Sequence, residues 1–225
     1  MESASPQQVY RALCYVVNGM LASKSAEYHK KNQGKQVYYM SMEFLVGTSL
    51  RNNLYNLGLE DVFAKALDKC GVDIHDLYEM EPDAGLGNGG LGRLASCYMD
   101  SASTLDLPMT GYSIRYEFGI FKQKIVDGWQ VEFPDDWLNM GDVWLVPHES
   151  EAVEVRFGGS VHGWEDNGKY RVKHVDFQSV MAVPNDMYIS GYESKAVNPL
   201  VLWSAKSPNS FDMSAFSRGD YAKAL

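Results

Sequence analysis

The sequence has few of the features that mark secreted, membrane or nucleic-acid-binding proteins. Its three cysteines, Cys14, Cys70 and Cys97, form no CxxC pair, which favours reduced thiols over a disulfide framework. No run approaches about 18 apolar residues and no signal-peptide pattern begins the chain, so no membrane span or secretion is predicted. Lys and Arg number 20 against 29 Asp and Glu, a net charge of −9, which disfavours nucleic acid and anionic membranes as partners. We therefore expect a cytoplasmic protein.

Metal-site spacing is also missing. The five histidines show no i, i+4 pairing on a helix and no cysteine neighbour at ligand spacing, so a metal site is not predicted; they are His29, His75, His148, His162 and His174. Apolar content of 45% and charged content of 22% are typical of a globular chain. A chain of this length can bury a substantial core in one or two domains.

Glycine, by contrast, is concentrated in one place. The stretch DAGLGNGGLGRLAS, Asp83–Ser96, contains five glycines in eight residues, at positions 85, 87, 89, 90 and 92. Such a cluster indicates backbone at positive φ or a ligand pressed against bare main chain. Apolar residues at helical spacing follow it and predict one buried face: Leu91, Leu94, Ala95, Tyr98, Ala102 and Leu105. A glycine loop that leads into a helix N-terminus favours an anion, most simply a phosphate.

Two other interpretations of this loop stay open. The glycines can serve only a tight turn with close helix packing. Gly87, Gly89 and Gly92 also fit the GxGxxG pattern of dinucleotide-binding oxidoreductases, although a fingerprint should follow a buried strand. The preceding segment, Asp73–Asp83, is acidic and predicts a short helix and a turn instead. No lysine follows the glycines, as a P-loop would require.

The order of elements along the chain predicts an α/β fold. Residues 1–36 form a helical lead-in that begins with a capping box at Ser5 and Gln8. Residues 37–110 alternate strand and helix around the glycine loop. Residues 111–225 are rich in strands, with a hairpin signal at Asp127-Gly128 and turns at Gly158-Gly159 and Asn167-Gly168, and end at a helix start near Ser217. Since the sequence from 221 to 225 is good helix former with no stop signal, we expect a truncated chain.

Four blocks resemble the α-glucan phosphorylases of glycogen, starch and maltodextrin, in order and spacing. They are VYYMSMEF at Val37–Phe44, the glycine loop with its helix at Asp83–Leu105, GYSIRYEFGIFKQKIVDGWQ at Gly111–Gln130 and LWSAKSP at Leu202–Pro208. The resemblance covers nearly the whole chain, but only the N-terminal quarter of that family. It implies a doubly wound, Rossmann-like fold of the glycosyltransferase-B type, with an inserted β-rich hairpin region.

The resemblance also implies a chemistry. In this family inorganic phosphate cleaves the terminal α-1,4-linked glucose of a glucan to give glucose 1-phosphate with retention, and some members are allosteric. The cofactor is pyridoxal 5'-phosphate on a lysine of the C-terminal half, so no lysine here is assigned to it. The implied partners are an α-1,4-glucan and phosphate, and members are usually homodimers. We expect the 225-residue chain alone neither to retain the cofactor nor to turn over glucan.

Carried over by position, the resemblance predicts site residues around the glycine loop. Gly89 and Gly90 would offer backbone N–H groups to the substrate and cofactor phosphates. Asn88 and Leu91 would line the glucose subsite, the first by hydrogen bonds and the second by apolar contact. Glu43 would border the same pocket, and Leu45 would contact the cofactor ring where some members have a tyrosine.

The sequence departs from the family pattern in three places. Gly47-Thr48 replaces a GR pair, Ser113 replaces a glycine, and little precedes the first helix, so control by phosphorylation in an N-terminal extension is not expected. Two further alternatives remain. The aromatic content suits a carbohydrate-binding module, through the five tryptophans Trp129, Trp137, Trp144, Trp164 and Trp203. A glycosidase could use a pair drawn from Glu117, Glu132, Asp135 and Asp136.

Overall fold

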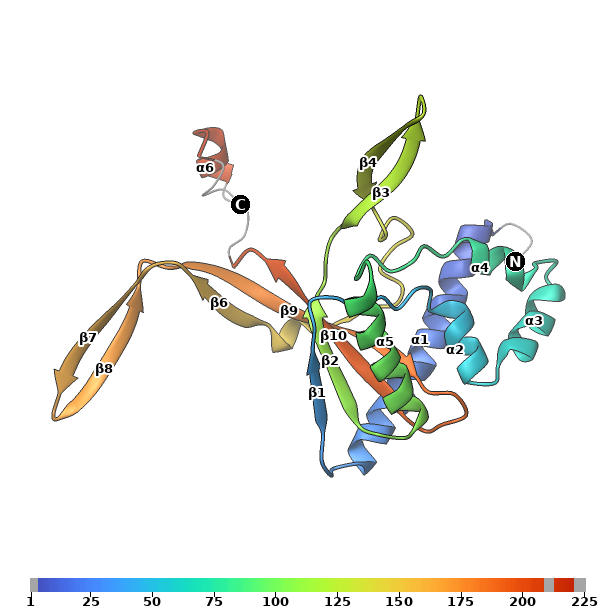
Figure 1. Cartoon of the computed structure of the whole chain (residues 1–225), viewed down its shortest axis with the longest axis horizontal. Helices are drawn as coiled ribbons and strands as arrows, with labels where there is room; N and C mark the ends of the chain where they lie inside the picture. Colours follow the sequence, from blue (N-terminus) through green and yellow to red (C-terminus); the bar gives the residue numbers. More distant parts are fainter. Residues whose placement is uncertain (1–3, 209–212, 221–225) are drawn as a thin grey trace. The chain divides into compact units, whose positions relative to one another are not determined.

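The computed structural model describes residues 4–208 and 213–220 (Figure 1). The chain divides into two compact units. The first unit comprises residues 1–146 and 185–202, and the second comprises 147–184 and 203–225. The mixed α/β class predicted from the sequence is confirmed. The division at residues 36 and 110 stays a prediction.

Five helices belong to the first unit: α1 Pro6–Lys31, α2 Leu50–Asn56, α3 Glu60–Asp68, α4 Ile74–Glu79 and α5 Gly90–Thr104. The capping box predicted at the start of α1 is confirmed, because Ser5 Oγ accepts from Gln8 N–H and Gln8 Oε1 accepts from Ser5 N–H. Gly58 and Gly71, both at positive φ, follow α2 and α3, as expected of glycines that end helices.

The main sheet has the strand order β1-β2-β10-β9-β5, with β6 also paired to β9 (Figure 1). Its strands are β1 Val37–Met40, β2 Met109–Ile114, β5 Val146–Pro147, β6 Val153–Phe157, β9 Gln178–Ser190 and β10 Val197–Lys206. β1 and β2 are parallel, with Val37 opposite Met109. The connection between them contains α2 to α5, and α5 packs against β2.

Two hairpins form separate two-stranded sheets (Figure 1). The first unit has β3 Gly119–Val126 with β4 Trp129–Asp135, and the second has β7 Ser160–Asp166 with β8 Lys169–Val175. The turns predicted at Asp127-Gly128 and Asn167-Gly168 are confirmed, and each joins the two strands of a hairpin. Asp127 and Gly128 have φ of 52° and 82°, and Asn167 and Gly168 have 51° and 74°, so both central residues of each turn are left-handed as a type I′ turn requires.

The first unit holds two apolar clusters. One lies between α5 and the sheet and includes Phe44, Leu86, Met99, Leu200 and Leu202. The other lies among the helices and includes Tyr10, Val17, Leu21, Leu50, Leu54 and Leu77. Trp144 packs against both clusters. The glycine loop is therefore anchored on both sides in the same core, by Leu86 near its start and by Met99 in the helix that follows.

The buried face of α5 differs from the prediction. Small residues and one methionine face the core: Gly92, Ala95, Ser96, Met99, Ala102 and Ser103. Four residues of the predicted face are exposed instead: Leu91, Leu94, Tyr98 and Leu105. α5 packs mainly through small side chains and Met99, and its leucines and Tyr98 are exposed.

The second unit also contains the short 3-10 helix Glu149–Glu151 and α6 Met213–Ser217. Ser217 ends that helix, so it is not the helix start predicted from the sequence. The helix expected over 221–225 lies outside the described residues.

Candidate functional site

Two segments distant in sequence lie side by side at the candidate site. We call residues 43–50, which follow β1, and residues 81–92, which precede and begin α5, the paired segments. Backbone bonds join them: Ala84 N–H donates to Gly47 O at 3.1 Å, Phe44 N–H to Leu86 O at 2.8 Å, and Leu45 N–H to Gly92 O at 2.9 Å. The predicted residues Glu43 and Leu45 are thus brought to the glycine loop.

Glu43 and Asn88 form the side-chain contact of this pairing. Glu43 Oε2 accepts from Asn88 N–H at 3.2 Å, and Glu43 Oε1 accepts from Asn88 Nδ2 at 3.4 Å. A Cβ on Gly92 would lie 3.1 Å from Glu43 Oε2, and one on Gly87 would lie 2.8 Å from Leu45 N. These two glycines are needed because the paired segments approach so closely.

Gly89 and Gly90 lie at the open end of the loop. Gly89 is the N-cap of α5 and Gly90 its first residue, and the first helical bond runs from Arg93 N–H to Gly89 O at 2.9 Å. Within the described residues, neither glycine N–H has a hydrogen-bond partner. A Cβ built on either glycine would meet no atom within 4 Å. These amides are accessible donors at the positive end of a helix.

The amide of Asn88 is not part of this open set, because the Glu43 carboxylate already accepts from it. The arrangement therefore has two parts with different chemistry. Gly89 and Gly90 offer donors to an anion, whereas Glu43 brings a negative charge that suits hydroxyl donors and repels a phosphate placed against it. Leu91 is 58% exposed beside the open amides.

Leu45 and Arg93 complete the surroundings. The Leu45 backbone is fully engaged, since its N–H donates to Gly92 and its carbonyl accepts from Arg93 Nη1 at 3.4 Å. Only the partly buried side chain of Leu45 is available for apolar contact. From the sequence alone, Gly87 and Gly92 were not distinguished from the other glycines of the loop as packing positions. Their spacing within the glycine cluster was the signal that could have indicated this role.

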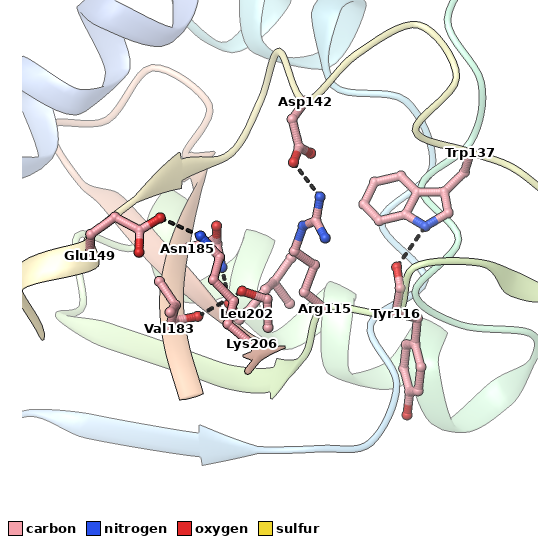
Figure 2. Close-up of polar contacts among 10 residues, drawn as sticks. Arg115, Tyr116, Trp137, Asp142, Glu149, Val183, Asn185, Leu202 and Lys206 are labelled. Carbon is pink, nitrogen blue, oxygen red and sulfur yellow. Dashed lines mark hydrogen bonds and ion pairs between the residues drawn. The ribbon is translucent and has the colours of Figure 1, made fainter. Parts of the chain in front are cut away.

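The segment after β2 supports the Glu43 side of the site. Tyr116 Oη donates to Met42 O at 2.9 Å, and Trp137 Nε1 donates to Tyr116 O at 3.0 Å. Figure 2 shows the Trp137 bond beside the ion pair of Arg115 with Asp142. The residue next to Glu43 is therefore fixed by a chain of bonds that ends on a buried tryptophan.

The alternatives find less support. The glycine loop follows α4 and irregular backbone, not the strand that a dinucleotide fingerprint requires. Of the tryptophans, Trp137 is buried while Trp129 and Trp164 are exposed on separate hairpins. Among the described residues, no group of three or more His, Cys, Asp or Glu is arranged to hold a metal ion. No helix in the described part of the chain has the length and apolar content to cross a membrane.

Comparison with known proteins gives a consistent result. The family described as carbohydrate phosphorylase matches residues 67–225. Glycogen phosphorylase of Chlamydia pneumoniae is 48% identical over 100% of this chain and 28% of its own length. The brain form of glycogen phosphorylase of Homo sapiens is 44% identical over 99% of this chain and 26% of its own length. The chain spans about a quarter of the length of the curated relatives it matches.

Proposed function

Since the chain belongs to the carbohydrate phosphorylase family, we propose that it supplies part of the active site of an α-1,4-glucan phosphorylase. The reaction is attack of inorganic phosphate on the terminal α-1,4-linked glucose, which yields glucose 1-phosphate. One observation carries the proposal: the N–H groups of Gly89 and Gly90 are open at the start of α5.

The physical argument concerns charge. A reaction with a phosphate nucleophile and an oxocarbenium-like transition state needs fixed donors for the anion more than a protein nucleophile. Backbone amides at a helix N-terminus supply such donors without reorganisation. Gly89 and Gly90 are held by the backbone of α5 and by the paired segments, so their donors stand in place before a ligand arrives.

The same geometry supports the sugar-facing roles that we propose. Glu43 and Asn88 border the amides, and the carboxylate oxygens of Glu43 and the side-chain oxygen of Asn88 can accept from the hydroxyls of a glucose ring. Leu91 offers an exposed apolar side chain for the ring face. We assign Asn88, Leu91 and Glu43 to the glucose subsite on this basis.

The residues present fit one part of pyridoxal 5'-phosphate. The open amides of Gly89 and Gly90 suit its phosphate group, and the Leu45 side chain suits its ring. When bound, this cofactor supplies a phosphate that exchanges a proton with the substrate phosphate. The assignment of no lysine in this chain to the cofactor stays a prediction.

The fold type, the oligomeric state and the cellular location are part of the same proposal. A glycosyltransferase-B-type, doubly wound sheet is supported by the parallel pair β1 and β2, whose connection carries α5. The exposed apolar face of α5 is the kind of surface that a further layer covers. We extend the proposal to a cytoplasmic homodimer. Its reduced cysteines support that location.

The test uses proline and alanine at one position. Proline is favoured as the first residue of a helix, so Gly90→Pro removes the N–H and leaves α5 intact. Gly90→Ala keeps the N–H, and its Cβ enters open space. Inorganic phosphate is titrated onto the isotope-labelled chain while the Gly89 and Gly90 amide resonances are followed by NMR.

The wild-type chain and Gly90→Ala should bind phosphate alike. Gly90→Pro should bind about 10 to 100 times more weakly, which corresponds to one charge-assisted hydrogen bond. Equal affinity in the proline and alanine variants, or no response of the Gly89 resonance in the wild-type chain, would contradict the proposed phosphate cradle.

A further inference from the structure

Glu81 holds a position that no sequence motif predicted. It lies between α4 and the glycine loop, and both of its carboxylate oxygens accept hydrogen bonds. Oε1 accepts from Ser49 N–H and from Trp144 Nε1, each at 2.8 Å, and Oε2 accepts from Leu50 N–H at 2.9 Å. Three donors from two other segments thus converge on one side chain.

The backbone donors belong to the start of α2. Ser49 and Leu50 are buried, with 8% and 0% of their surface exposed, so water does not replace a lost acceptor. The Ser49 side chain makes no capping bond in the described structure. Glu81, 32 residues from Ser49 along the chain, instead accepts from the N–H groups of the N-cap residue and of the first helical residue.

The same contact closes one end of the paired segments. Most of the partners run in antiparallel order, Ser49 and Leu50 with Glu81, Gly47 with Ala84, Phe44 with Leu86, and Glu43 with Asn88, whereas Leu45 N–H reaches past this run to Gly92 O. A glutamate carboxylate bonds backbone N–H of the opposite segment at each end of the run. Between the two ends the contacts are backbone to backbone.

We propose that Glu81 is a positioning residue of the candidate site. By holding the start of α2 against the residues before the glycine loop, it fixes where Glu43 stands relative to Asn88 and the open amides. The proposal deepens the function given above and rests on it for the meaning of the site. The geometry that Glu81 controls is independent of the ligand.

The surroundings of Glu81 explain why this contact is sensitive. Tyr10 and Cys14 face it from α1, Asp83 faces it from its own segment, and Asp142 lines the same small cavity of about 30 Å³. No cation in the described residues bonds the carboxylate. Its charge is balanced only by the three N–H donors, so loss of any one is costly.

The experiment separates local positioning from a general loss of stability. Amide hydrogen exchange is measured by NMR on the 225-residue chain and on Glu81→Gln, with Glu79→Gln as the matched control. Glu79 is exposed on α4, and its replacement removes the same charge. The reporting amides are Phe44, Ala84 and Asn88, and the amide of buried Val17 in α1 serves as the reference.

In Glu81→Gln the three reporting amides should exchange on the order of tenfold faster, beyond any change at Val17, because a glutamine cannot accept from all three donors. Glu79→Gln should leave them unchanged. A uniform acceleration that includes Val17 would overturn the proposal and reduce Glu81 to a cap of α2.

A second variant keeps the test decisive if Glu81→Gln does not fold. Trp144→Phe removes one donor and retains both backbone bonds, so the same amides should accelerate by a smaller factor. No selective acceleration in that variant would overturn the proposal. The selective acceleration can also occur while phosphate does not shift the Gly89 and Gly90 amide resonances of the wild-type chain. In that case Glu81 positions the paired segments, and only the proposed function fails.

Discussion

The carboxylate of Glu43 accepts both the backbone and the side-chain N–H of Asn88, at 3.2 and 3.4 Å, across 45 residues of sequence. Because of this contact the Asn88 amide already has an acceptor, whereas the amides of Gly89 and Gly90 are open. The proposed anion-binding site is therefore narrower than the glycine cluster suggests, and Gly87 and Gly92 serve close packing.

Replacement by alanine should change stability differently at Gly87, which packs against Leu45, and at Gly90, which lies in open space. A Cβ at Gly87 would lie 2.8 Å from Leu45 N and 3.1 Å from Leu45 Cα, so the backbone of the paired segments must separate. We expect Gly87→Ala to lower the free energy of unfolding by about 1–3 kcal/mol. Gly90→Ala meets open space and should be neutral or stabilising by up to about 1 kcal/mol.

Urea unfolding of both variants, followed by tryptophan fluorescence, makes this comparison. The two substitutions add the same methyl group within four residues of each other, so chain composition does not explain a difference. Equal stabilities would show that the approach of Gly87 to Leu45 relaxes without cost.

Two buried serines should respond to alanine with opposite signs. Ser113 Oγ is buried and has no hydrogen-bond partner within the described structure. Removing an unsatisfied hydroxyl should stabilise the chain by about 1 kcal/mol. Ser103 Oγ donates to Ile189 O and accepts from Asn198 Nδ2, each at 3.1 Å, so Ser103→Ala should cost about 1–3 kcal/mol.

Thermal unfolding by circular dichroism reports both changes. The resemblance led us to expect a glycine at position 113, and the unpartnered hydroxyl of Ser113 gives that departure a physical consequence. Destabilisation by Ser113→Ala would mean that its hydroxyl finds a partner in solution.

Local signals in the sequence predicted local structure correctly. The capping box at Ser5 and the turns at Asp127-Gly128 and Asn167-Gly168 are confirmed because each depends on residues next to one another. The orientation of α5 was wrong for four of six residues, including Leu94 and Leu105. Apolar spacing marks a stripe of large side chains, whereas the packed face of α5 consists mostly of small ones.

The site was predictable only in part for a related reason. The helix after the glycine loop followed from its pattern, and the resemblance placed Glu43 beside it. Glu81 had no signal, because its donors at Ser49, Leu50 and Trp144 are 31 to 63 residues away. A carboxylate that accepts from amides so far away in the sequence produces no local residue pattern from which the contact could be predicted.

His29 predicts a loss of stability in mild acid. Burial lowers the pKa of His29 below its ordinary value of 6.5, against a backbone hydrogen bond at Val197 that raises it. The folded chain then binds this proton less readily than the unfolded chain, so stability is lost as pH falls below 6.5. His29→Gln should remove that part of the slope, and His75→Gln, at an exposed histidine, should retain it.

Denaturant midpoints measured at several pH values around 6.5 test this. The difference between the wild-type chain and each variant isolates one histidine, because the other groups titrate in both. An unchanged slope in His29→Gln would show that the ring is hydrated in solution.

Glu81 predicts a slope of the opposite sign. Burial, with the charge of Asp83, raises the pKa of Glu81 above its ordinary 4.5, although its three hydrogen bonds lower it. The folded chain therefore holds this proton more tightly than the unfolded chain.

The stability that the protonation of Glu81 contributes is complete below pH 4.5 and is lost as pH rises through the folded pKa. Glu81→Gln cannot titrate at this position, so its free energy of unfolding should fall less across that window than that of the wild-type chain, while Glu79→Gln should behave as the wild-type chain does. Urea unfolding on both sides of pH 4.5 measures the difference. A parallel fall in Glu81→Gln and wild type would mean that the three N–H donors outweigh the burial of the carboxylate.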